Sequence, residues 1–98
     1  MACIKVYLPK DAKHAKDTLP VVKRLISGHL GGYTTYEGSG GWRDSNGDLI
    51  HEDVWVIESY GESYQKTYDV AGRSARLIKR MTNEESVLVS VNHEPRYL

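Results

Sequence analysis

The residues of this chain whose side chains could do chemistry gather in one segment, between residues 31 and 60. The candidate binding residues in it are Tyr36, Glu37, Trp42, Arg43, Asp44 and His51. Aromatic rings beside charged groups are typical of binding hot spots, because they combine a large contact area with polar contacts. Six of the nine glycines also fall within residues 31–48. Since glycine is costly to order, this concentration predicts a shaped, exposed feature that binds a partner or a small ligand.

A plainer interpretation of the same segment is structural. Trp42 could fold over a sheet as part of the core, and Arg43 could pair with Asp44 or Glu52 and so stiffen the chain. The residue types alone leave the binding and the structural interpretations open.

A catalytic interpretation rests on His51 and the acidic residues that follow it. Neighbouring residues of a strand point to opposite faces, so His51 and Glu52 cannot form one acid–base pair. His51 and Asp53 share a face and could act as an oriented base, and Glu58 is a further candidate for proton transfer. A solvated strand end is the plainer interpretation of these side chains.

Other kinds of site find little support in the sequence. The glycine-rich run 38–41 could form an anion nest, but phosphate loops open a helix and bring a lysine, whereas this run leads into a hairpin. The remaining histidines (His14, His29 and His93) show no metal-ligand spacing, so we expect no metal and no cofactor. Cys3, alone on a strand, is expected to be an inert packed thiol.

The charge balance disfavours several classes of partner. The 13 basic and 13 acidic side chains cancel, so the chain lacks the electrostatic footprint that a nucleic-acid-binding protein usually shows. A basic face on the second expected helix (Arg73, Arg76, Lys79 and Arg80) is interpreted as solvated. No apolar run approaches membrane-spanning length, the first residues do not resemble a signal peptide, and one cysteine rules out an internal disulfide. We therefore expect a cytoplasmic protein with no membrane contact.

Alternation of apolar and polar residues predicts the strands that must position the candidate site. Residues 2–8 alternate, with the even-numbered side chains apolar and the odd-numbered ones on the opposite face. Residues 49–60 form the long returning strand of a hairpin, with an apolar centre, and 86–91 form a last strand whose three valines share a face. The polar, proline-containing tail 92–98 is expected to leave the sheet.

Two helices are predicted from apolar residues at helical spacing. Thr18 is a suitable N-cap for the first, over 18–30, and Gly31 is a strong C-terminal stop. The second begins at Tyr64, shows a four-three apolar spacing, and stops at Asn83.

The candidate site should lie on a hairpin between the helices. Asn46-Gly47 is the best short hairpin signal in the chain, because both central positions of a type I′ turn need positive φ. A two-residue turn there would place Trp42 opposite His51, with a bulge expected among the glycines. Each side of the hairpin would span about 45 Å, against about 20 Å for the first helix. The hairpin must therefore overhang the domain or fold back on its glycines.

The element order is strand, helix, hairpin, helix, strand over a single domain of residues 1–98. This order predicts an α+β, ferredoxin-like βαββαβ fold, with a four-stranded antiparallel sheet, two helices on one face and a long central β-hairpin. The open face of such a sheet often pairs with a second copy. We expect a homodimer, formed through the sheet or through the hairpin.

Several of these residues also match a known pattern. The matching positions are Gly32-x-Thr34, Gly40/Gly41-Trp42-Arg43-Asp44, Gly47, Glu52 and Glu85-Ser86-Val87-Leu88. They resemble the bacterial family known as domain of unknown function 3574. The resemblance covers about a third to two fifths of the chain and implies a compact α+β domain with the Trp42-Arg43-Asp44 arm as its recurring feature. It implies no reaction, because that family has none assigned.

Two functions are compatible with these sequence features. The favoured one is a non-enzymatic binding or inhibitory accessory module, of the kind that phages and mobile elements encode, acting through the hairpin arm. The alternative is a small enzyme of the dimeric α+β barrel type, using His51 or a nearby carboxylate for proton transfer.

Overall fold

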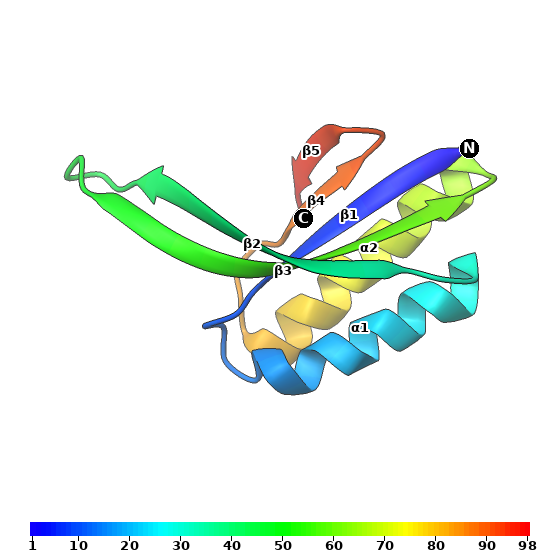
Figure 1. The fold of residues 1–98 in the computed structure, drawn as a ribbon, viewed down its shortest axis with the longest axis horizontal. Helices are drawn as coiled ribbons and strands as arrows, with labels where there is room; N and C mark the ends of the chain where they lie inside the picture. The colour runs from blue at the N-terminus through cyan, green and yellow to red at the C-terminus, as the bar shows by residue number, and fades with distance from the viewer.

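The structure is a computed structural model that describes residues 1–98. Its elements, in chain order, are β1 (Ala2–Pro9), α1 (Ala15–Leu30), β2 (Thr34–Arg43), β3 (Leu49–Gly61), α2 (Tyr64–Thr82), β4 (Leu88–Val91) and β5 (Glu94–Tyr97). Every strand pair is antiparallel, and the sheet order is β2-β3-β1-β4-β5. Both helices cover one face of the sheet and leave the other open (Figure 1). The α+β class is confirmed, but the predicted count of four strands is wrong, since the sheet has five.

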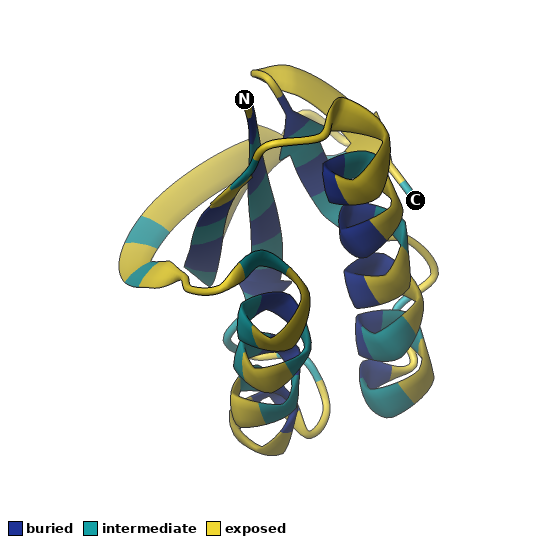
Figure 2. Ribbon diagram, turned by 90° about the vertical axis from the view of Figure 1, so that its right-hand side faces the viewer, coloured by how far each residue is buried: buried dark blue, intermediate teal, exposed yellow.

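The alternation in β1 sets which face of the sheet becomes the core. Ile4, Val6 and Leu8 are fully buried under the helices, while the residues between them are only half-buried on the open face. The core cluster contains 14 buried residues, drawn from both helices, from β1 and β3, and from β4 with the residue just before it. Figure 2 shows the buried residues of each helix on the side turned toward the sheet. The predicted division of β1 into two faces is therefore confirmed.

The helices agree with the sequence at three of their four ends. Gly31 (φ 93°) and Asn83 (φ 66°) end α1 and α2 in the left-handed conformation, as predicted. α2 begins as predicted at Tyr64, but α1 begins at Ala15, and Thr18 is a buried residue inside it rather than its N-cap. Burying Ala15 adds a turn of helix to the core, and this outweighs the capping preference of Thr18. No helix combines the length and the apolar character that crossing a membrane requires.

The tip of the β2–β3 hairpin differs from the predicted two-residue turn. The N–H of Gly47 donates to the carbonyl of Asp44 at 3.0 Å, and Gly47 has φ 83° while Asn46 is not left-handed. This is a three-residue loop, a type I turn followed by a left-handed glycine. The pairing is consequently shifted by one residue: Trp42 lies opposite Ile50, and Gly41 lies opposite His51. The predicted Trp42–His51 pair is wrong.

The glycines of β2 do not interrupt this pairing. The register runs without a break from Arg43 opposite Leu49 to Thr34 opposite Glu58, so the expected glycine bulge is absent. The anion nest, which the sequence already disfavoured, is absent as well, because residues 38–41 are extended strand and none has the positive φ that a nest needs.

The tail forms a fifth strand rather than leaving the sheet. Asn92 (φ 51°) and His93 (φ 68°) are both left-handed, so the two-residue hairpin turn expected at residues 46–47 occurs here instead. The Asn92 side chain also accepts the backbone N–H of Cys3 at 2.9 Å, which ties the turn to β1. Pro95 is tolerated because β5 is an edge strand.

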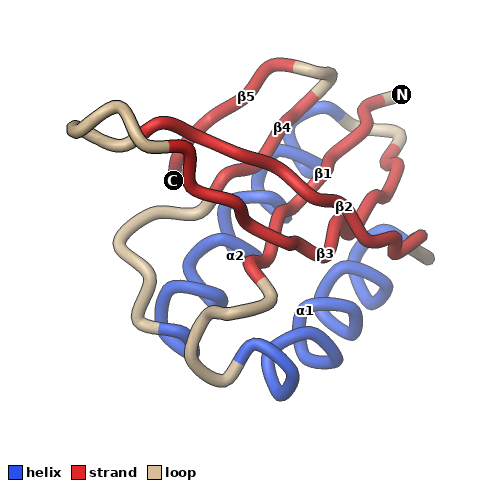
Figure 3. The backbone as a smooth tube through the Cα atoms, turned by 60° about the vertical axis from the view of Figure 1, so that its left-hand side comes forward, coloured by secondary structure: helices blue, strands red, loops and turns tan.

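The outer part of the β2–β3 hairpin projects from the domain. β1 pairs with β3 only as far as Val54, which lies opposite Gly38. Residues 39–53, which we call the arm, therefore have no third strand beside them. The arm extends past the other strands (Figure 3), and the molecule measures 43 Å along its longest axis. Of the two alternatives that the hairpin length left open, the structure shows the overhang.

Candidate functional site

The open face of the sheet brings together side chains from four strands. Register and alternation place on it Lys5 and Tyr7 of β1, Tyr36 and Trp42 of β2, Glu52, Glu58 and Tyr60 of β3, and Leu88 of β4. Two adjoining features lie on this face. One is a groove beneath the arm, and the other is a polar cluster around Glu58.

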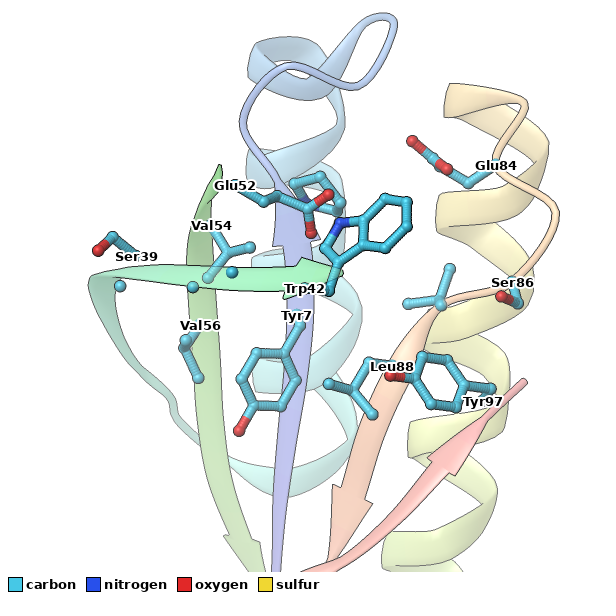
Figure 4. Close-up of a pocket in the computed structure, with 15 residues that line it drawn as sticks. Tyr7, Ser39, Trp42, Glu52, Val54, Val56, Glu84, Ser86, Leu88 and Tyr97 are labelled. Atoms are coloured by element: carbon cyan, nitrogen blue, oxygen red, sulfur yellow. The ribbon is translucent and has the colours of Figure 1, made fainter. Parts of the chain in front are cut away.

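The groove beneath the arm, which we call the arm groove, has a volume of about 440 Å³. Its lining combines aromatic, aliphatic and acidic side chains with the glycine-rich backbone of β2. The lining side chains used below are Tyr7, Trp42, Glu52, Val56, Glu84 and Tyr97. In Figure 4, Trp42 lies between Glu52 and Glu84, with Tyr7, Leu88 and Tyr97 below it. The volume is in the range that accommodates small organic ligands.

The arm groove combines acidic and aromatic side chains. Partial burial, and then the carboxylates of Asp11 and Glu84, raise the pKa of Glu52 above its ordinary value. Trp42 is 54% exposed and Tyr97 74% exposed, so both rings offer a free face. Carboxylates and exposed aromatic faces are the two kinds of group that attract an organic cation.

The Glu58 cluster consists of Lys5, Tyr36, Glu58 and Tyr60. The Tyr36 hydroxyl donates to Glu58 Oε2 at 3.2 Å, the Tyr60 hydroxyl donates to Glu58 Oε1 at 3.0 Å, and Lys5 Nζ lies 3.8 Å from Oε2. The hydrogen bond to Glu58 and the charge of that carboxylate raise the pKa of Tyr60 to about 12. Partial burial, followed by the charge of Glu58, also raises the pKa of Tyr36. Both phenols are therefore neutral donors at physiological pH.

Alternation along the strands divides the predicted binding residues between two faces. Tyr36 and Trp42 lie on the open face, where Tyr36 joins the Glu58 cluster and Trp42 lines the arm groove. Glu37, Arg43 and His51 occupy odd-numbered positions and therefore lie on the opposite face. Lys10 binds Glu37 there at 2.7 Å, and this hydrogen bond lowers the pKa of Glu37.

Arg43 and Asp44 hold the tip of the arm together. Asp44 Oδ1 accepts the backbone N–H groups of Asn46 and Asp48, each at 2.9 Å, and Arg43 Nη1 donates to the Gly47 carbonyl at 2.8 Å. These contacts satisfy backbone groups of the loop, so this pair supports the shape of the turn.

The residues considered for proton transfer also separate. His51 and Asp53 are exposed on the face away from the arm groove, while Glu58 lies on the open face with three polar partners. The chain contains no group of three or more His, Cys, Asp or Glu side chains placed to hold a metal ion.

Sequence reasoning missed several residues of the arm groove. The alternation of residues 2–8 places Tyr7 on the face of β1 opposite the apolar side chains, but it does not identify the neighbours of Tyr7 there. Glu84 and Tyr97 come from segments far from the arm in sequence, and Tyr97 belongs to the strand that was not predicted. The alternation of 49–60 could have grouped Glu52 with Val56 and Glu58, because all three are even-numbered.

Comparison with known proteins gives a similarity of fold. No protein-family model matches the chain, so the resemblance to domain of unknown function 3574 rests on its motifs alone. No curated protein matches it either. Among solved structures, a phage SAM lyase in its apo state is similar, with a TM-score of 0.73, 12% identity, and coverage of 99% of this chain and 87% of that chain. A phage SAM lyase in complex with S-methyl-5′-thioadenosine is also similar, with a TM-score of 0.66, 15% identity, and coverage of 99% and 88%. At these identities the likeness establishes the fold.

Proposed function

We propose that this protein is a lyase that binds S-adenosylmethionine on the open face and breaks a carbon–sulfur bond of its sulfonium. The observation that carries the proposal is the arm groove, in which Glu52 and Glu84 stand beside the free ring face of Trp42. Such a groove favours a flat organic cation, and the fold it shares with the phage SAM lyases points to this one. The step from shared fold to shared ligand is an analogy.

The parts of the ligand match the parts of the open face. An adenine ring would stack on Trp42, and the sulfonium would lie near the two carboxylates, since both attractions act on a positive, flat molecule. The amino-acid end carries one positive and one negative group. The oppositely charged pair Lys5 and Glu58, two residues along β3 from the groove residue Val56, is suited to hold it.

The reaction that we infer needs no oxidant or reductant. The bond between sulfur and the four-carbon amino-acid chain breaks, and both electrons go to sulfur, which leaves as neutral S-methyl-5′-thioadenosine. In the same step the four-carbon fragment either loses a proton from the neighbouring carbon to solvent water, forming a carbon–carbon double bond, or is attacked by its own carboxylate, forming a lactone. In both cases the two products, together with any released proton, have the mass of the substrate, whereas a hydrolase would add one water.

The test is to incubate the protein with S-adenosylmethionine and to follow S-methyl-5′-thioadenosine by liquid chromatography and mass spectrometry. We expect release of this product, and a loss of at least tenfold in turnover for Glu52→Gln. The matched control is Asp53→Asn, the same change of charge one residue away on the opposite face. No product and no binding at millimolar substrate, or an equal loss in both variants, would contradict the proposal.

A second candidate is the non-enzymatic binding or inhibitory accessory module. It is favoured by the high exposure of Trp42 on the projecting arm and by the position of His51 outside the groove. Titration calorimetry separates the two candidates, because an accessory module would bind S-adenosylmethionine or another partner with no release of product. Trp42→Ala should weaken binding, while Arg43→Ala should not, because Arg43 contacts only the loop backbone.

Two further proposals concern the fold type and the association of the chain. We infer that β1 to β4 with both helices form a ferredoxin-like unit to which β5 is added, and that the protein forms a homodimer through the sheet or the arm. Sedimentation of the purified protein at micromolar concentration would test the association state.

A further inference from the structure

The neutral net charge of the chain conceals two oppositely charged layers. α1 and α2 carry eight of the 13 Lys and Arg residues but only two of the 13 Asp and Glu residues. The helix layer therefore has a net charge of +6, and the remainder of the chain has a net charge of −6. Because both helices lie on the same side of the sheet (Figure 1), this division along the sequence is also a division in space.

Lys79 Nζ donates to the Leu98 carbonyl at 3.2 Å, and the cations of the helix layer form no salt bridge with an Asp or Glu side chain. They are Lys16, Lys23, Arg24, Lys66, Arg73, Arg76, Lys79 and Arg80. The three salt bridges of the protein all use cations outside the helices. Asp69, one of the two helical acids, accepts a hydrogen bond from Gln65 at 3.1 Å instead of pairing with a cation. The exposed cations of this layer, Arg73, Arg76 and Arg80 among them, are therefore available to an external partner.

Three arginines form a stripe along the outer side of α2. Arg73, Arg76 and Arg80 follow the spacing i, i+3, i+7, which places them on one face of the helix, and all three are exposed. The buried residues of α2 occupy the side turned toward the sheet (Figure 2). Lys66 extends the stripe, and the distance along the helix from Lys66 to Arg80 is about 21 Å, or about six base-pair steps of 3.4 Å.

We propose that the helix layer binds the phosphate backbone of double-stranded nucleic acid, with Arg73, Arg76 and Arg80 as the main contacts. Arginine suits this partner because its planar guanidinium can donate two parallel hydrogen bonds to one phosphate. A lipid surface fits less well, because Tyr64 is the only large apolar side chain exposed on either helix, and surface-bound helices need several to enter the lipid. The inference is independent of the lyase proposal, since the arm groove lies on the opposite side of the sheet.

The test measures binding of a fluorescent 20-base-pair DNA duplex by anisotropy at several salt concentrations. Four phosphate contacts give a slope of log K against log salt of about −3.6, so the affinity should fall about 150-fold between 50 and 200 mM NaCl. The triple variant Arg73→Gln/Arg76→Gln/Arg80→Gln should reduce the slope to about −1. The charge-matched control Lys10→Gln/Lys13→Gln/Arg96→Gln changes cations outside the helices and should retain the steep slope. Thermal unfolding of both variants checks that they fold.

Several results would overturn the inference. No binding at 50 mM NaCl would do so, as would an equal loss in the two triple variants, which would indicate general attraction rather than a site. Tighter binding to vesicles of phosphatidylserine and phosphatidylcholine than to DNA would assign the layer to a membrane. Self-association that the arginine variant abolishes, with no DNA binding, would assign it to the acidic arm of a second copy.

Discussion

Gly61 offers the sharpest test of how the two helices meet the sheet. It ends β3, opposite Ala2, and its φ lies outside the left-handed region, so alanine suits the backbone. A Cβ at this position, however, would overlap Thr67 Oγ1 and lie 3.1 Å from Leu30 Cδ2. Thr67 is fully buried, and its hydroxyl donates to the Ser63 carbonyl at 2.6 Å. Gly61→Ala must therefore displace the buried side chain of Thr67 from its hydrogen-bonded position.

The cost of this substitution can be worked from two contributions. Overpacking a core position costs about 1–3 kcal/mol, and turning Thr67 away from Ser63 leaves a buried hydroxyl without a partner, at about 1–3 kcal/mol. Using the lower bound of each, Gly61→Ala should reduce the free energy of unfolding by at least about 2 kcal/mol. For a domain of this size the melting temperature should then fall by at least about 8 °C.

The assay is urea unfolding of the single and double variants, followed by circular dichroism. Thr67→Ala removes the overlapping oxygen, so the double variant should lose less stability than the sum of the two single variants, by at least about 1 kcal/mol. Additive losses, or a loss below about 0.5 kcal/mol for Gly61→Ala alone, would refute the reasoning about this contact.

Three further predictions concern stability and titration. Gly28→Ala should raise the free energy of unfolding by about 0.5–1 kcal/mol in urea titrations, because a Cβ there meets nothing within 4 Å and alanine is the better helix former. The Tyr60 phenol should titrate near pH 12 when followed by absorbance at 295 nm. Its pKa in the folded protein is above the ordinary value of 10.0. Its contribution to stability is therefore present below pH 10 and is lost as pH rises toward 12. Glu58→Gln should return that titration to the ordinary range. Glu52→Gln should raise the free energy of unfolding at pH 7 by less than about 1 kcal/mol, because the group is partly exposed, and the melting temperature should rise slightly. The same variant should bind S-adenosylmethionine more weakly.

Much of the fold follows from signals that act locally. The alternation of β1 is strict, and Gly31 and Asn83 end the helices because their left-handed conformations are inexpensive for these two residue types. The first residue of α1 does not follow from local signals, because the choice between Ala15 and Thr18 depends on whether Ala15 is buried against the rest of the core.

The two hairpin turns show why the strand register of a hairpin could not be predicted from the sequence. Asn46-Gly47 is compatible with a type I′ turn and with a type I turn closed by a left-handed glycine, and the two differ by one residue. That single residue decides whether Trp42 faces His51 or Ile50. At the other turn, Asn92 takes its conformation together with a hydrogen bond to β1, a contact that depends on tertiary structure.

The sequence indicated the segment that contains the candidate site, but only some of the residues that form it. Tyr36 and Trp42 were named for their rings, and both lie on the open face. Glu84 and Tyr97 reach the arm groove only because the arm twists across the sheet, and no local pattern encodes that approach. A two-stranded ribbon without a third strand twists more strongly than a wide sheet, which is a property of the whole hairpin.

The arm also determines how occupancy of the groove could be detected. None of residues 39–53 is buried, so the arm contributes nothing to the core and can open while the rest of the domain stays folded. Amide hydrogens of residues 39–53 should then exchange through local opening, and those of β1 only through global unfolding. A ligand that holds the arm against the sheet would slow exchange in the arm, by a factor of about 1 + [L]/Kd, in excess of any change in β1. Hydrogen exchange would thus measure affinity at this site even for a compound that is never turned over.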